Sequence, residues 1–249
     1  MTQSHKVLLI VVMAAAAIGG ILLVDPIPQN PDYHRFVDAR TLFGVPNFWN
    51  VASNLPFLIA GGLGLLQVRR IASADLATHY RVFSAAIALV ALGSAWFHLS
   101  PSTPTLVWDR LPMTVAFMAI FAVVIGDRLA AGLGRWLLWP LVVAGIASIA
   151  WWLRTETAGA GDLRPYALVQ FLPMLLIPVM LLMWRGEGLS SRHLWMAFAA
   201  YVLAKVAEHF DAAILAATGL GGHALKHLLG ALAAWWIVRA FQGAPARDL

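Results

Sequence analysis

Long apolar runs, separated by short polar stretches, dominate this chain. The first run, residues 7–24, follows Lys6 and is long enough to cross a bilayer core of about 30 Å at about 1.5 Å per residue. Hydrophobic residues make up 61% of the 249 positions and charged residues only 12%, which is unlike a soluble or a disordered domain. The sequence therefore predicts an all-α fold, a polytopic membrane helix bundle.

Seven further spans are expected where apolar runs lie between polar residues, prolines and glycines. They cover residues 48–67, 80–99, 110–126, 136–153, 166–184, 194–209 and 223–241. With the run at 7–24 this makes eight spans: a seven-span core and an extra N-terminal transmembrane helix.

The first run is expected to remain as a transmembrane helix or uncleaved signal anchor within residues 1–24. A cleaved signal peptide is the alternative, but Leu22-Leu23-Val24-Asp25-Pro26 lacks the small residues of a cleavage site. Residues 25–46 are expected to form a polar loop, residues 47–241 the seven-span domain, and residues 242–249 a cytoplasmic tail.

Lysine and arginine are distributed unevenly between the two ends of the predicted spans. One side collects ten of them and the other five, so both termini are expected in the cytoplasm of a plasma or inner membrane, with the loop at 25–46 facing outward. The ten are Lys6, Arg69, Arg70, Arg81, Arg128, Arg135, Arg185, Arg192, Arg239 and Arg247, and the five are Arg35, Arg40, Arg110, Arg154 and Arg164.

Composition also limits the chemistry and the partners. The chain has no cysteine, so disulfides, iron–sulfur clusters and thiolate metal sites are excluded. The net charge of +5 comes from residues in short loops that set topology, so nucleic acid binding is not indicated. No protein partner is identifiable, and the oligomeric state stays open.

A pair of histidines opens the last predicted span. His223 and His227 are four residues apart and therefore lie on one face of a helix, where both imidazoles can bind one ion. His98 is predicted at the same outward side of the membrane and supplies a third ligand. Three protein ligands with a fourth position open to water are typical of catalytic zinc sites, so the sequence predicts Zn²⁺ at this position.

Two further residues complete the predicted site. Asp109 stands at the head of the next span, where it can act as general base, and Ser94 lies one turn from His98, where it can donate a hydrogen bond to the water or the oxyanion. Each has a structural alternative: Asp109 could cap its helix, and Ser94 could allow close helix packing or bond to its own backbone.

A second polar cluster comprises Lys205, Glu208, His209 and Asp211. Lys205 and Glu208 could simply neutralise each other. His209 could replace one of the three ligands or form a hydrogen bond to one of them without binding the metal itself. Lys226 points off the face of the histidine pair and is expected either to extend outward or to meet Glu208.

These motifs together resemble the alkaline ceramidase family, seven-span membrane hydrolases grouped with adiponectin-receptor-like and Per1-like proteins. The resemblance covers about residues 47–241. It is carried by Asn47-Phe-Trp-Asn-Val-Ala-Ser-Asn54, Ser94-x3-His98, Asp109, Glu208-His-Phe-Asp211 and His223-x3-His227.

The resemblance implies zinc at His98, His223 and His227, water activation by Asp109 and oxyanion assistance by Ser94. It implies hydrolysis of the amide of a ceramide-like N-acyl lipid to a long-chain base and a fatty acid, with the lipid reaching the site laterally from the membrane. Eukaryotic members share an acidic Ca²⁺ site. The loop here carries Asp32, Asp38 and Asn47 without a clear match, so Ca²⁺ is a weaker expectation than Zn²⁺.

Two other classes of function use the same histidines without catalysis. A haem-binding electron carrier would use them as axial ligands on facing helices and has no need of Asp109 or Ser94. A receptor-like or transport protein would use the metal only structurally.

Overall fold

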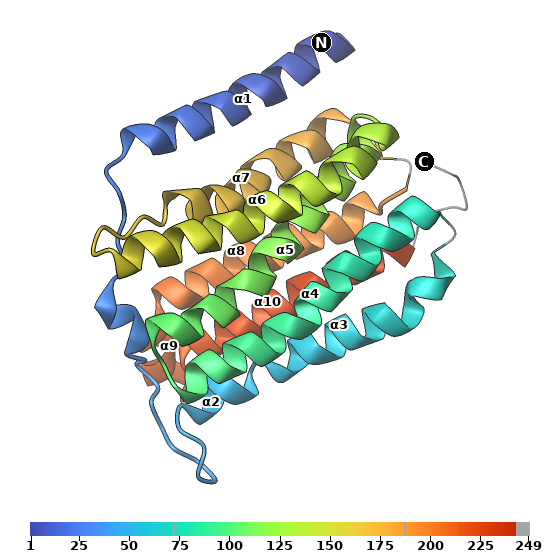
Figure 1. Cartoon of the computed structure of the whole chain (residues 1–249). Coiled ribbons are helices and arrows are strands. Elements are labelled where there is room, and N and C mark those ends of the chain that lie inside the picture. The colour runs from blue at the N-terminus through green and yellow to red at the C-terminus, as the bar shows by residue number, and fades with distance from the viewer. Residues whose placement is uncertain (72, 187, 243–249) are drawn as a thin grey trace.

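The computed structural model describes residues 1–71, 73–186 and 188–242, and within them it is a bundle of helices (Figure 1). Most of the predicted tail at 242–249 lies outside the described residues. In chain order the helices are α1 (Gln3–Leu23), η1 (Pro31–His34), α2 (Phe48–Ala52), α3 (Leu55–Gln67), η2 (Val68–Arg70), α4 (Ala74–Leu99), α5 (Thr103–Arg128), α6 (Ala131–Thr157), α7 (Arg164–Met183), α8 (Ser191–His209), α9 (Asp211–Thr218) and α10 (Gly222–Gln242).

Seven helices in the described ranges are long and apolar enough to cross a membrane, so the chain is a multi-pass membrane protein. They are α1, the continuous segment Phe48–Arg70, α4, α5, α6, α7 and α10. The remaining predicted span, residues 194–209, forms the 19-residue helix α8 of the bundle. This helix is not among the seven, because charged residues such as Lys205 and Glu208 make it less apolar.

Helices α4 and α5 form the centre of the bundle, because their buried side chains make up much of the main apolar cluster. Apolar side chains of α3 and α6 point outward in large numbers, as in helices that face lipid. Helix α1 packs along α7 at the edge of the bundle (Figure 1), and Ile10 is its one buried residue. The extra helix predicted from the first apolar run is therefore present as an addition to the core.

Several helices begin earlier than their apolar runs. Helix α5 begins at Thr103, seven residues before the predicted span, because Ser102 and Thr105 form a reciprocal capping box at its start. Asp109 therefore lies in the second turn of α5 and not at its N-terminus. The prediction that Asp109 could cap its helix is wrong, because Ser102 fills that role.

The loop at residues 25–46 folds over one end of the bundle, next to α2 and α9 (Figure 1). Arg40 ties it down by donating to Asp38 Oδ2 at 2.6 Å and to the carbonyl oxygen of Gly219, also at 2.6 Å. This hydrogen-bonded guanidinium lowers the pKa of the Asp38 carboxyl below its usual value. The loop is therefore anchored to the segment that leads into α10.

Candidate metal centre

Three buried histidines meet beneath this loop. His98 comes from the end of α4, and His223 and His227 come from the first two turns of α10. One ring nitrogen of each lies within 4.8 Å of the others, and the side chains are between 1% and 9% exposed. The structure therefore brings together the three residues that the sequence singled out, in an arrangement that could hold a metal ion.

The mutual orientation of the rings favours a single ion. The ring centroids are 4.9 to 5.0 Å apart in all three pairs, so each imidazole contacts the other two directly. Axial ligation of haem would require a flat macrocycle between two of these rings. The direct contacts leave no such slot at this site.

The hydrogen bonds of His227 fix which of its nitrogens is free. Its Nδ1 lies 2.9 Å from the Ser53 hydroxyl, which itself donates to the carbonyl oxygen of Asn50 at 3.2 Å. The Ser53 hydroxyl donates its single proton to the carbonyl oxygen of Asn50, so it accepts a hydrogen bond from Nδ1–H of His227. The lone pair of the His227 ring is therefore on Nε2. Metal-binding histidines are commonly oriented by such a partner on the other nitrogen.

His98 and His223 also present nitrogens suited to an ion. Nδ1 of His98 is buried without a hydrogen-bond partner, which is costly for a polar atom unless it binds something else. Nε2 of His223 accepts from the Lys226 ammonium at 3.1 Å and therefore carries a lone pair. The donor set of three neutral imidazoles suits Zn²⁺, although Lys226 would have to give up this contact if Nε2 became the ligand.

Backbone contacts hold these histidines in place. The Asn47 side chain donates to the carbonyl oxygen of His98 at 2.8 Å, and Asp211 accepts from the backbone N–H of His223 at 3.0 Å. Gly222 lies so close to the start of α9 that a Cβ there would be 2.7 Å from the Cα of Asp211. Asp211 therefore positions His223 at the start of α10.

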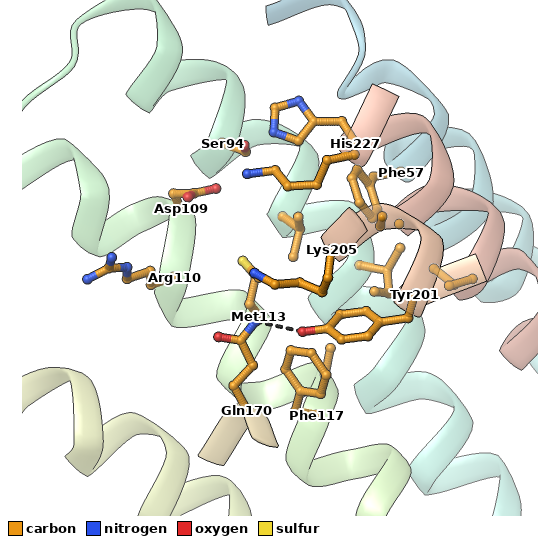
Figure 2. Close-up of a pocket in the computed structure, with 18 of the residues that line it drawn as sticks. Phe57, Ser94, Asp109, Arg110, Met113, Phe117, Gln170, Tyr201, Lys205 and His227 are labelled. Atoms are coloured by element: carbon orange, nitrogen blue, oxygen red, sulfur yellow. Dashed lines mark hydrogen bonds between the residues drawn. The ribbon is translucent and has the colours of Figure 1, made fainter. Parts of the chain in front are cut away.

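Ser94 and Asp109 face each other across the contact between α4 and α5. Asp109 is partly buried, and its side chain and that of Ser94 line the same cavity. Figure 2 shows both side chains pointing toward His227.

Gly93 sets the distance between these two helices. A Cβ at this position would overlap the carbonyl group of Trp108, with its carbon 2.6 Å away, and would lie 3.3 Å from the backbone nitrogen of Asp109. The missing side chain thus lets α4 approach α5 where Ser94 and Asp109 meet.

Replacing Gly93 by Ala is therefore expected to separate the two helices and to lower the free energy of unfolding by about 1–3 kcal/mol, the usual cost of overpacking. Thermal unfolding of the purified protein measures the effect. Gly62→Ala is the matched control, because a Cβ on Gly62 meets no atom within 4 Å. An unchanged unfolding temperature in Gly93→Ala would contradict the close contact.

The polar cluster on α8 divides into inward and outward residues. Glu208 accepts from Lys226 at 2.8 Å and also pairs with Lys205, so Lys226 meets Glu208 and does not extend outward. His209 is exposed and lies on the outer surface between α7 and α8, away from the three histidines. The structure does not place His209 among the ligands.

A cavity of about 390 Å³ leads away from the histidines. Ser94, Asp109, Lys226 and His227 line the cavity beside the metal centre, and apolar residues such as Ile87 and Ile120 line much of the rest. Further polar side chains in the lining are Arg110, Gln170, Tyr201, Lys205 and Glu208. Figure 2 shows the labelled side chains around this space. The cavity can therefore enclose a molecule with polar groups and a long apolar portion.

Sequence reasoning missed the aromatic residues of the loop. The ring of Phe36 lies 4.6 Å from that of His98 and 5.4 Å from that of His223, and Tyr33 stacks on Phe97 at 6.3 Å. These rings close the metal centre from the outside. Within a loop without helical periodicity, the sequence offers no signal that Phe36 packs on residues more than sixty positions away.

The fold and the site define a class: a membrane-embedded helical bundle with a buried three-histidine centre at one end and an apolar cavity beside it. Residues 43–242 match the family model described as Ceramidase, which is most of the chain. This protein belongs to the ceramidase family. Among curated proteins, no sequence matches this chain.

Proposed function

We propose that the protein is a Zn²⁺-dependent membrane hydrolase that cleaves the amide bond of ceramide-like N-acyl lipids. The observation that supports this most strongly is the convergence of His98, His223 and His227 beside a cavity that also contains Asp109. Family membership supports the substrate class. A zinc ion held by the three imidazoles would supply the Lewis acidity that activates water and polarises the amide carbonyl.

Asp109 is the proposed general base. Its carboxylate takes a proton from the attacking water as the oxygen bonds to the carbonyl carbon, and returns it to the amine nitrogen as the carbon–nitrogen bond breaks. Ser94 orients this carboxylate. Lys226, held by Glu208, keeps a positive charge next to the carbonyl oxygen on which negative charge develops.

The lipid is proposed to reach the site sideways, between α7 and α8. A groove on the outer surface shares Phe171, Tyr201 and Lys205 with the inner cavity, so the two spaces adjoin at these residues. A hydrogen bond of 2.7 Å from Gln170 to the Tyr201 hydroxyl links the two helices there (Figure 2). The site is proposed to lie near the outer membrane surface, with both termini in the cytoplasm.

The proposal is tested by incubating membranes with purified wild-type protein and with the variant His223→Ala, followed by lipid analysis. The wild-type protein should release fatty acid and a long-chain base from added ceramide, and the variant should not. Equal lipid profiles in the two samples would contradict the proposed reaction.

Ser53→Ala is expected to lower zinc affinity or activity by about 10- to 100-fold, because His227 loses the partner that orients its ring. Zinc affinity is measured by competition with a chelator. Ser148→Ala is the matched control, since Ser148 is equally buried but bonds only to the carbonyl oxygen of Gly145 in its own helix, at 2.7 Å. Equal zinc affinity in both variants would show that Ser53 does not support the ligand.

A further inference from the structure

We propose that Arg110 is the centre of an anion-binding subsite, which takes a carboxylate on the amine portion of the substrate. The inference rests on the proposed amide hydrolysis and concerns which N-acyl lipids the site prefers: a lipid with an acidic group on its amine portion should bind more tightly than a neutral lipid. It is carried by the burial of Arg110, its lack of an acceptor and the charges around the cavity.

Arg110 belongs to the same cavity as the metal centre. It follows Asp109 directly on α5, is only 6% exposed and lines the cavity. In Figure 2 its side chain extends to the other side of α5 from His227, toward the part of the cavity that Tyr33 and Tyr166 also line. A ligand could therefore contact the metal centre and Arg110 with different groups.

The guanidinium lacks an acceptor among the described residues. No carboxylate lies within ion-pair distance of it, and its Nη1 is buried without a hydrogen-bond partner. The buried Arg128, by contrast, is paired with Asp127 at 3.0 Å. A buried arginine without a carboxylate is unusual, because its charge and its five donors are costly to remove from water.

Aromatic rings surround Arg110 and account for only part of this cost. Its Cζ lies 4.6 Å from the ring centroid of Trp152, 4.9 Å from that of Tyr166 and 5.3 Å from that of Tyr33. Ring faces attract the positive charge but do not accept the in-plane N–H bonds of the guanidinium. The aromatic residues hold the planar, fork-shaped guanidinium group in one orientation and leave its N–H donors available to a planar anion.

The charged side chains of the cavity leave Arg110 as the cation without a carboxylate partner among the described residues. The side chains that line the cavity include three cations (Arg110, Lys205 and Lys226) and two carboxylates (Asp109 and Glu208), and the proposed Zn²⁺ would add further positive charge. The two lysines share Glu208, and Arg110 is the cation without a partner. A carboxylate carries one charge and matches the guanidinium fork, whereas a phosphate monoester carries nearly two.

Binding without catalysis tests the subsite. The full-length variant Asp109→Asn in detergent is titrated with N-dodecanoylglycine and with its neutral analogue N-dodecanoylglycinamide. The acid should bind about tenfold more tightly or better, since a hydrogen bond to a charged partner typically has this effect. Equal affinities would overturn the subsite.

Substitution of Arg110 should remove this discrimination. Adding Arg110→Gln should bring the two affinities to within about twofold, and Arg110→Lys, which keeps the charge but not the fork, should give an intermediate ratio. Arg154→Gln, a change at an exposed arginine outside the cavity, is the control and should leave the ratio unchanged. If Arg110→Gln does not fold, the Arg110→Lys variant is the test. An unchanged ratio of the affinities for the acid and its neutral analogue in that variant contradicts the role of the guanidinium group in binding the carboxylate.

Hydrolysis by the wild-type protein separates this inference from the proposed function. If the wild-type protein cleaves N-dodecanoylglycine with a lower KM than N-dodecanoylglycinamide, the result supports both the anion-binding subsite and the hydrolase. If it cleaves both probes with the same KM, the result contradicts the preference for an acidic lipid but agrees with the proposed amide hydrolysis. Selective binding of the acid without cleavage of either supports the subsite and contradicts the hydrolase. Tighter binding of an N-acylethanolamine phosphate than of the acid would overturn the assignment to a carboxylate.

Discussion

Asp109→Asn is expected to reduce amide hydrolysis by about 10²- to 10⁴-fold while zinc remains bound, because the amide keeps the shape of the carboxylate but cannot accept a proton from water. The carboxylate lies opposite Ser94, on the side of α5 that faces His227 (Figure 2), and is separate from the three imidazoles. Hydrolysis is measured as the release of fatty acid from a short-chain ceramide in detergent, and zinc by elemental analysis of the same sample.

Asp75→Asn is the matched control for this change. Asp75 lies near the beginning of α4, whereas the site lies at the end of that helix, and its contact with Arg135, at 3.5 Å, is partly exposed. Its replacement should leave hydrolysis within about twofold, as for most surface substitutions. Wild-type activity in Asp109→Asn would remove Asp109 from the mechanism.

His98→Ala is expected to abolish both zinc binding and hydrolysis, because two imidazoles from α10 cannot replace a three-ligand set. His98 is the one ligand that comes from another helix, so its removal also tests whether α4 and α10 share an ion. Zinc should fall from one per chain to well below that ratio, measured after extensive dialysis against metal-free buffer.

His209→Ala provides the control for His98→Ala. His209 belongs to the motif that sequence reasoning considered as an alternative source of a ligand, but it is exposed on the outer surface. The variant should keep one zinc per chain and full activity. Loss of zinc in His209→Ala, with zinc retained in His98→Ala, would show that a different set of side chains holds the metal.

Much of the architecture followed from simple periodicity and apolar length. The helical membrane fold is confirmed, and so is the extra helix at the N-terminus, because an apolar run of this length has few alternatives in a bilayer. The i, i+4 spacing of His223 and His227 placed them on one helix face, and the alternation of spans placed His98 at the same end. That Zn²⁺ binds there and that Asp109 acts as base remain predictions.

Other features depended on contacts that no local pattern encodes. The span at 194–209 forms a helix, yet its Glu208 pairs with Lys226 on α10, an interaction visible only once the helices are side by side. The positions of Phe36 against His98 and of Tyr33 against Arg110 likewise result from how the loop at 25–46 folds over the bundle. Such contacts join residues far apart in sequence.

Removal and return of the metal tests the central claim most directly. Purified wild-type protein is treated with a strong chelator, assayed for release of fatty acid from ceramide, and assayed again after one equivalent of Zn²⁺ per chain is added. The account predicts no release after chelation and recovery of activity at one equivalent. Hydrolysis that persists in the zinc-free protein, or that does not return with zinc, would contradict it.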